Sequence, residues 1–390
     1  MNFQPRPDLS TAQRRLPFDC IALLLQGGGA LGAYQAGVYQ ALAEADIHPD
    51  WVAGISIGAI NAAIIAGNPP EARVDRLRDF WSEVTSNGPW HWPGASLLDS
   101  VQGDETRNFL NQLSAGFALA YGATGFFSVR PTLPWLQAGG KIEATSFYDT
   151  RALKSTLERL VDFDRLNAGM TRFSAGAVNV RTGNFVYFDN TTHRIQPEHV
   201  MASGALPPGF AAVEIDGEYY WDGGLVSNTP LQWVLEGGTP QDMLAFQVDL
   251  WNARGQLPRN IAEVATRQKE IQFSSRTRAN TDQFKHVQRL RHALAALLNR
   301  LPEDLSQHED VKLLTTAASH STYNIVQLIY RASSHEGPSK DYEFSRPSMQ
   351  DHWRAGYHDA LRTLRHPEVL ARPTTPDGVF TFDLEQDGRE

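Results

Sequence analysis

Apolar residues near the start of the chain occur in continuous runs that end at glycines. Residues 20–26 (CIALLLQ) form one such run before three glycines, which is typical of a strand buried on both faces. Residues 30–45 carry apolar side chains at helical spacing, and a short run at 51–53 precedes an apolar helix predicted at 57–66. This order of strand, helix, strand and helix predicts a parallel α/β sheet with helices packed on it.

The middle of the chain is less regular. Residues 86–148 are rich in glycine and aromatic residues and have weak periodicity, so we expect either a cap or a loop excursion from the sheet. The α/β pattern then returns. The elements expected there are a helix at 150–160 and strands at 172–179, 184–189, 218–221 and 244–250.

The composition changes again near residue 258. Residues 259–300 hold nine Lys/Arg against three Asp/Glu, and apolar residues at helical spacing mark one face of a helix there. A predicted strand at 323–330 and a helix at about 347–364 follow. The apolar residues that mark the helix face are Val287, Leu290, Leu294, Leu297 and Leu301.

These patterns predict three parts of the chain. A loose arm at 1–17 precedes an α/β domain at 18–255, which includes the cap or excursion at 86–148. A mainly helical extension covers 256–390. Because its predicted strand can join the main sheet, the sequence does not predict that this extension folds on its own.

Composition narrows the classes of protein. With 42% hydrophobic and 20% charged residues, the 390-residue chain can bury a large core, which excludes wholesale disorder. A net charge of −9 disfavours a general nucleic-acid binder. Cys20 is the single cysteine and forms no intrachain disulfide, which fits a reducing compartment. The run at 20–25 is too short for a membrane span, and polar and glycine residues interrupt 108–129, so we expect a cytoplasmic protein.

Two glycine-rich turns follow the first two predicted strands. Residues 54–58 (GISIG) are a GxSxG sequence, which is typical of a strand-to-helix turn so tight that it exposes the serine hydroxyl, here that of Ser56, at the C-terminal end of the sheet. A serine in an ordinary strand-to-helix turn is the weaker alternative. Residues 27–32 (GGGALG) open the first helix, and consecutive glycines let backbone N–H groups approach a bound oxygen. The amides of Gly28 and Gly29 can therefore form an oxyanion hole for acyl transfer.

The first glycine turn also allows an alternative. Residues 27–32 match GxGxxG, the dinucleotide-binding fingerprint. That function requires an acidic residue at the end of the second strand, whereas Asp46 and Asp50 come before this strand, which ends in Gly54-Ile55-Ser56. A dinucleotide-dependent oxidoreductase is therefore the weaker hypothesis.

A serine nucleophile needs a base, and Asp222 is the best candidate. It ends an aromatic-rich predicted strand in the sequence WDGG, where two glycines allow an immediate turn. A partly dry site would make its carboxylate a better base. The residues alone leave an ordinary surface turn equally open. Histidines such as His286, His292, His335 and His352 lie in the polar helical tail or in loops and are weaker candidates.

Four ordered motifs resemble those of the patatin-like phospholipases. They are the glycine loop at 27–32, the GxSxG turn at 54–58, an SxAxPxxF-like turn at 203–210, and DGG at 222–224 followed by Asn228-Thr229-Pro230. The resemblance covers about residues 21–250. Many members carry Lys or Arg where this chain has Leu31, so the chain lacks that cation.

This resemblance implies a three-layer α/β/α fold and a Ser–Asp dyad that works without histidine. The part beyond about residue 258 looks like an extension carried by a bacterial subgroup, and no role is implied for it. The roles implied are Ser56 as nucleophile, Asp222 as general base, Gly27, Gly28 and Gly29 as oxyanion loop, and Gly32, Gly54, Gly58, Gly223 and Gly224 as supports.

We therefore expect a serine lipid acyl hydrolase that uses an acyl-enzyme and neither a cofactor nor a metal. The region 86–148 is expected either to cover an acyl chain or dock at a lipid interface, or to be a fixed cap. The basic helix at 259–300 is expected either to contact anionic membrane surfaces or to be simply solvated. A third hypothesis is a non-enzymatic interaction protein that uses this basic tail. The sequence leaves the ester, its chain length and the oligomeric state open.

Overall fold

The computed structural model describes residues 16–86, 104–237, 241–274, 277–302, 305, 308–332, 336–337, 339–375 and 377–384. Most of the predicted arm at 1–17 and residues 87–103 of the predicted cap lie outside the described residues.

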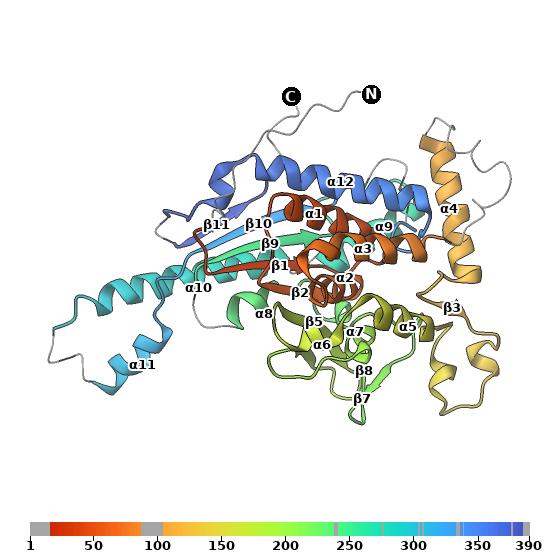
Figure 1. Cartoon of the computed structure of the whole chain (residues 1–390), viewed down its shortest axis with the longest axis horizontal. Helices are drawn as coiled ribbons and strands as arrows, with labels where there is room; N and C mark the ends of the chain where they lie inside the picture. The colour runs from red at the N-terminus through yellow and green to blue at the C-terminus, as the bar shows by residue number, and fades with distance from the viewer. Residues whose placement is uncertain are drawn as a thin grey trace.

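A nine-stranded mixed sheet forms the centre of the molecule (Figure 1). The strand order is β11-β10-β9-β1-β2-β5-β8-β7, and β6 also pairs with β5. The six strands from β11 to β5 are parallel, whereas β6, β7 and β8 are antiparallel to their neighbours. The strands are β1 (Cys20–Leu25), β2 (Trp51–Ile55), β5 (Arg172–Asn179), β6 (Phe185–Asp189), β7 (Val213–Ile215), β8 (Glu218–Asp222), β9 (Met243–Asp249), β10 (Tyr323–Ile329) and β11 (Val379–Phe382).

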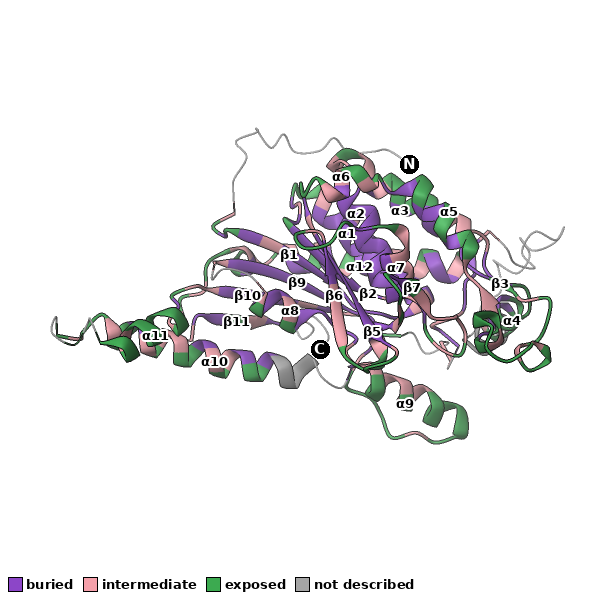
Figure 2. Ribbon diagram, turned by 90° about the horizontal axis from the view of Figure 1, so that it is seen from below, coloured by how far each residue is buried: buried purple, intermediate pink, exposed green. Residues whose placement is uncertain are grey.

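Helices cover both faces of this sheet, as alternate residues of β1 show. Leu23 and Leu25 belong to a core shared with α1 (Ala33–Glu44), α2 (Ile57–Ala66) and α3 (Pro70–Val84). Cys20, Ala22 and Leu24 belong to a second core shared with α8 (Leu231–Glu236) and α10 (Thr277–Leu298). The strands between these layers are mostly buried (Figure 2). The expected three-layer α/β/α fold is confirmed.

The C-terminal residues join the same sheet. β10 pairs in parallel with β9, and β11 pairs in parallel with β10. α12 (Arg346–Leu364) packs on α1 so closely that a Cβ at Gly37 would lie 1.9 Å from the Trp353 carbonyl oxygen. A Cβ at Gly356 would lie 2.0 Å from the Tyr34 carbonyl oxygen. The strand predicted at 323–330 and the helix predicted at 347–364 are confirmed, while the boundary at 256 stays a prediction.

Two details differ from the sequence expectations. The described part of 86–148 contains an 18-residue helix, α4 (Asp104–Tyr121), which its weak periodicity did not predict. On α10, Leu290 and Leu297 are 57% and 59% exposed, and the helix instead buries Phe284 and Gln288.

The other elements are α5 (Arg151–Leu160), α6 (Phe163–Asn167), α7 (Pro197–Ser203), α9 (Ile261–Ser274), α11 (Glu309–Ala317), β3 (Ser128–Val129) and β4 (Tyr148–Asp149), with 3-10 turns at Gly29–Gly32, Pro134–Leu136, Ile142–Thr145, Gly223–Leu225 and Pro367–Leu370.

Among the described helices, none combines the length and apolar character needed to cross a bilayer.

Candidate active site

Ser56 stands between β2 and α2 in a strained backbone conformation, with φ 57° and ψ −124°. This region of conformational space costs a residue with a side chain about 1–3 kcal/mol, so the surrounding structure has to hold it. The buried Ser203 hydroxyl does so: it accepts a hydrogen bond from Ser56 N at 3.0 Å and donates to the Gly176 carbonyl at 2.7 Å.

Glycine is required at both Gly54 and Gly58 of the GxSxG turn because backbone carbonyl oxygens lie very close to these two positions. A Cβ at Gly54 would lie 2.2 Å from the Gly58 carbonyl oxygen. A Cβ at Gly58 would lie 2.2 Å from the Leu25 carbonyl oxygen, at the end of β1. The chain can therefore make this turn, and present Ser56, only with glycine at both positions.

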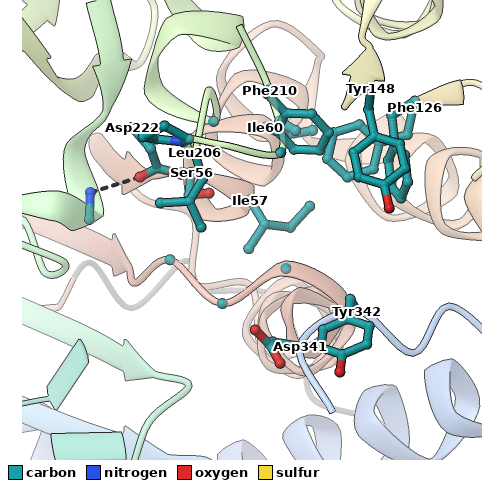
Figure 3. Close-up of a pocket in the computed structure, with 18 of the residues that line it drawn as sticks. Ser56, Ile57, Ile60, Phe126, Tyr148, Leu206, Phe210, Asp222, Asp341 and Tyr342 are labelled. Carbon is teal, nitrogen blue, oxygen red and sulfur yellow. Dashed lines mark hydrogen bonds between the residues drawn. The ribbon is translucent and has the colours of Figure 1, made fainter. Parts of the chain in front are cut away.

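Asp222 ends β8 and is brought next to Ser56 (Figure 3). Asp222 is 2% exposed, and its carboxylate accepts a hydrogen bond from Gly224 N at 2.7 Å. Burial raises the pKa of Asp222 to about 6, although side-chain hydrogen bonding with Ser56 and the Gly224 bond act in the opposite direction. Gly223 is needed here because a Cβ would lie 2.6 Å from the Gly176 carbonyl oxygen.

The turn at 203–210 holds both of these side chains in place. Ser203 binds the backbone of Ser56, and the Ala205 carbonyl accepts a hydrogen bond from Asp222 N at 3.0 Å. The SxAxPxxF-like motif marks this turn in the sequence but indicates no role for its residues. The turn lies between the ends of β2 and β8. This position explains why the motif contains the small polar residue Ser203 and the small apolar residue Ala205.

The glycine loop lies directly against Ser56. A Cβ at Gly27 would lie 3.1 Å from Ser56 Cβ. The Gly27 N–H donates to the Asn228 carbonyl at 3.3 Å, and its carbonyl accepts from Asn228 Nδ2 at 3.0 Å and Trp251 Nε1 at 2.9 Å. Within the described residues, the N–H groups of Gly28 and Gly29 have no protein acceptor, so they are the donors still available to a bound oxygen.

Gly32 supports this arrangement from the first helical turn. A Cβ there would lie 2.6 Å from Ile57 Cγ1, so glycine lets the loop pack on the start of α2. Asn228 and Trp251, which hold Gly27, were not assigned roles from sequence. The NTP that follows DGG is the signal for Asn228, whereas no motif marks Trp251.

A cavity of about 300 Å³ opens beside Ser56, Asp222 and the glycine loop. Its walls are mainly apolar and come from α2, α4, the turn at 203–210 and the C-terminal region. The aromatic side chains that line it are Phe126, Phe127, Tyr148, Phe210, Trp251, Phe273, Tyr342 and Phe344.

The histidines proposed as weaker candidates lie elsewhere. His292 contacts the Ser321 carbonyl, His352 is buried beside Glu336, and His286 is exposed. None of them is among the described residues that line the cavity, and His335 lies outside the described residues.

The acidic residues needed for dinucleotide binding are also distant from the glycine loop. The Asp50 carboxylate accepts a hydrogen bond from Ile21 N at 2.8 Å, near the start of β1 and so at the opposite end of the parallel strands from the glycine loop. Asp46 lies in the preceding turn. Over the described residues, no group of three His, Cys, Asp or Glu is arranged to hold a metal ion.

The chain is similar to known proteins over most of its length. A family profile described as patatin-like phospholipase matches residues 23–235, and a second one, described as patatin phospholipase, matches 271–376. Patatin-like phospholipase domain-containing protein 7 of Mus musculus is 46% identical over 76 residues, which are 20% of this chain and 6% of that protein. Neuropathy target esterase sws of Drosophila sechellia is 26% identical over 223 residues, 57% of this chain and 12% of that protein.

Among solved structures, VipD from Legionella pneumophila has 16% sequence identity and a TM-score of 0.40, with 95% of this chain and 72% of that chain covered. The chain matches no more than 12% of the length of the two curated relatives. The first family profile, by contrast, matches more than half of this chain, and the chain therefore belongs to the patatin-like phospholipase family.

Proposed function

We propose that this protein is a serine lipid acyl hydrolase in which Ser56 is the nucleophile and Asp222 the general base. The observation that carries the proposal is the buried Asp222 carboxylate, which lies beside the strained Ser56 at the head of an apolar cavity. A family member with a hydroxyl, a carboxylate and an apolar cavity in this arrangement is suited to cleaving esters of fatty acids.

In the proposed reaction, Ser56 Oγ bonds to the ester carbonyl carbon while its proton passes to the Asp222 carboxylate. The tetrahedral intermediate collapses, the alcohol leaves with that proton, and an acyl-enzyme remains. Water then attacks the acyl-enzyme with Asp222 again as the base, and the fatty acid is released. A pKa of about 6 makes Asp222 a stronger base than an exposed aspartate, and it is still ionised at neutral pH.

The negative charge on the carbonyl oxygen needs donors nearby. We assign this role to the N–H groups of Gly28 and Gly29, which face no protein acceptor among the described residues. Each donor of this kind is typically worth a few kcal/mol in the transition state. The positive end of the ten-residue helix α2 adds to the stabilisation of charge at Ser56.

The cavity itself suits an acyl chain. Ile57 and Ile60 of α2 lie between Ser56 and the aromatic side chains of Phe126 and Tyr148 (Figure 3). An acyl group attached to Ser56 would extend along these isoleucines and end against the aromatic side chains. Burial of a methylene group contributes about 0.8 kcal/mol, so a chain of several carbons would be bound well.

The exposed surface beside the cavity suits a lipid phase. We define the apolar rim as the exposed side chains of Leu113, Phe117, Tyr121, Leu133, Trp135 and Leu136. Two residues near the rim in the chain, Leu119 and Tyr148, line the cavity wall, and Tyr148 Oη donates a hydrogen bond to the Leu119 carbonyl at 3.0 Å. We propose that this rim, rather than the basic α10, rests on the lipid that contains the substrate. In both views α10 and α4 lie toward opposite ends of the molecule (Figures 1 and 2).

A fluorophosphonate probe tests the proposed nucleophile. We expect the probe to label the wild type and not Ser56→Ala, while Ser155→Ala, a matched change on exposed α5, is labelled normally. Absence of labelling in the wild type together with tight NAD binding would instead favour the oxidoreductase. Absence of both labelling and NAD binding would favour a non-enzymatic interaction protein.

A further inference from the structure

The C-terminal region provides one wall of the cavity that contains Ser56. Phe273 at the end of α9 and Asp341, Tyr342 and Phe344 before α12 all line it. These residues lie beyond residue 258, where the motifs that carry the family resemblance have ended. The cavity is therefore incomplete without residues from this region.

This region also holds the glycine loop directly. The Asp341 carbonyl accepts a hydrogen bond from Ala30 N at 2.8 Å. A Cβ at Gly29, where φ is +56°, would lie 2.0 Å from the same oxygen. The backbone of residue 341 thus fixes the position of the loop whose amides face the reacting carbonyl.

Two ion pairs connect the segment 339–344 to α9. Lys269 Nζ lies 2.8 Å from Asp341 Oδ1, and Lys340 Nζ lies 2.9 Å from Glu270 Oε1. The Lys340 side chain is buried and its ammonium lies 5.3 Å from the centre of the Trp251 ring. The Lys340–Glu270 pair is mostly buried, and Arg267 also pairs with Glu270 at 3.2 Å, whereas the Lys269–Asp341 pair is half-buried. Because these charges are partly removed from water, breaking a pair costs more than it would at a fully exposed site.

Helix α9 is in turn tied to the catalytic domain. The Phe273 carbonyl accepts hydrogen bonds from Gln26 Nε2 at 3.2 Å and from Asn228 Nδ2 at 3.3 Å. Asn228 also holds Gly27, so α9, the segment 339–344 and the glycine loop form one connected unit.

Phe344 lines the cavity beside Phe126 and Phe127. Its ring lies 5.9 Å from the rings of both Phe126 and Phe127, measured between centroids. Phe126 lies away from Ser56 along the cavity (Figure 3). The Phe344 side chain therefore stands where the end of an acyl chain bound at Ser56 would lie.

We propose that segment 339–344, fastened to α9 by the two ion pairs, positions the oxyanion loop and, through Phe344, limits the length of the acyl chain. This inference rests on the proposed hydrolase function. It gives the C-terminal region a role in substrate selection and makes Asp341 a positioning residue through its backbone carbonyl.

The chain-length part is tested with p-nitrophenyl esters from butyrate to palmitate. Phe344→Ala should move the maximum of kcat/KM to longer chains, with a gain of roughly fourfold for each methylene newly accommodated. Phe344→Leu should give a smaller shift in the same direction, and Phe380→Ala, which changes an exposed side chain on β11, should keep the wild-type profile. An unchanged profile in both Phe344 variants overturns the inference.

The positioning part is tested with Lys269→Ala and the butyrate ester, whose short chain does not reach Phe344. We expect kcat per fluorophosphonate-titrated site to fall roughly tenfold with KM little changed, because a misplaced oxyanion donor acts on the transition state. The charge-exchanged double variant Lys269→Asp with Asp341→Lys should restore part of kcat. If kcat per titrated site is unchanged, the ion pair is only structural and the inference fails.

The titration separates this inference from the proposed function. A wild type that no fluorophosphonate labels contradicts the hydrolase assignment itself. A labelled wild type whose variants keep the wild-type profile and kcat contradicts only the role of the C-terminal region.

Discussion

Two regions build the cavity, and they place their side chains in different ways. The first region comprises residues 27–58 and 222–228, and the second comprises residues 269–344. In the first region, short turns at strand ends position Ser56, Asp222 and the glycine loop, and Gly54, Gly58 and Gly223 closely approach backbone carbonyls. In the second, Lys269, Lys340 and Asp341 act through ion pairs and one carbonyl across the surface of the fold. The strand-end turns therefore set the positions of Ser56 and Asp222, whereas the glycine loop and the shape of the cavity also depend on contacts with the distant C-terminal region.

The largest expected effect is at the GxSxG turn. Gly58→Ala would place a methyl group against the Leu25 carbonyl, where only backbone movement can relieve the overlap. We expect a loss of ~3 kcal/mol or more in the free energy of unfolding, measured by urea denaturation, together with loss of probe labelling. Gly116→Ala on α4, where a methyl group meets nothing within 4 Å, is the control and should be neutral or stabilising.

A similar change on the C-terminal side should have an intermediate effect. Gly356→Ala forces α12 away from α1, because its methyl group would meet the Tyr34 carbonyl oxygen. Two helices can separate more easily than one tight turn can change, so we expect a loss of ~2 kcal/mol in the same denaturation assay. A loss as large as that of Gly58→Ala would show that the packing of α12 on α1 is no more adaptable than the GxSxG turn.

Asp222→Asn should stabilise the protein while removing the general base. The pKa of Asp222 is raised by burial from an ordinary value of 3.8 to about 6, so its ionisation opposes folding. That penalty is fully present at and above about pH 7 and disappears as the pH falls from about 6 to below 4. The asparagine should gain about 2–3 kcal/mol at neutral pH and almost nothing at pH 4, in urea denaturation at each pH. A gain that is independent of pH would show that ionisation of Asp222 is not its source.

The smallest expected effect concerns the apolar rim. Trp135→Ser removes a side chain that is 68% exposed and should lower binding to phosphatidylcholine vesicles several-fold in a sedimentation assay. Leu313→Ser on α11, which removes another exposed apolar side chain, should leave vesicle binding unchanged. Equal losses in the two variants would indicate non-specific hydrophobic binding.

The sequence was informative where local chemistry is decisive. Ser56, Asp222 and their glycines could be predicted because the turns that present them tolerate few residue types. The face of α10 was predicted from its leucines, yet tertiary contacts bury Gln288, whose Nε2 donates to the Ser321 carbonyl at 2.9 Å. α4 was not predicted because it exposes Leu113 and Phe117 while burying Ala115, which removes a clear periodicity. No local pattern could indicate that Asp341 meets Ala30, more than three hundred residues earlier in the chain.

The central claim, that a buried aspartate deprotonates Ser56, is tested most directly by the pH dependence of the acylation rate. Stopped-flow measurement with p-nitrophenyl butyrate should show a wild-type rate that rises about tenfold per pH unit and levels off near pH 6, where Asp222 becomes ionised. Asp222→Asn should be slower by at least about a hundredfold and should lack this transition. An asparagine variant that acylates at the wild-type rate with the same pH profile would contradict the account.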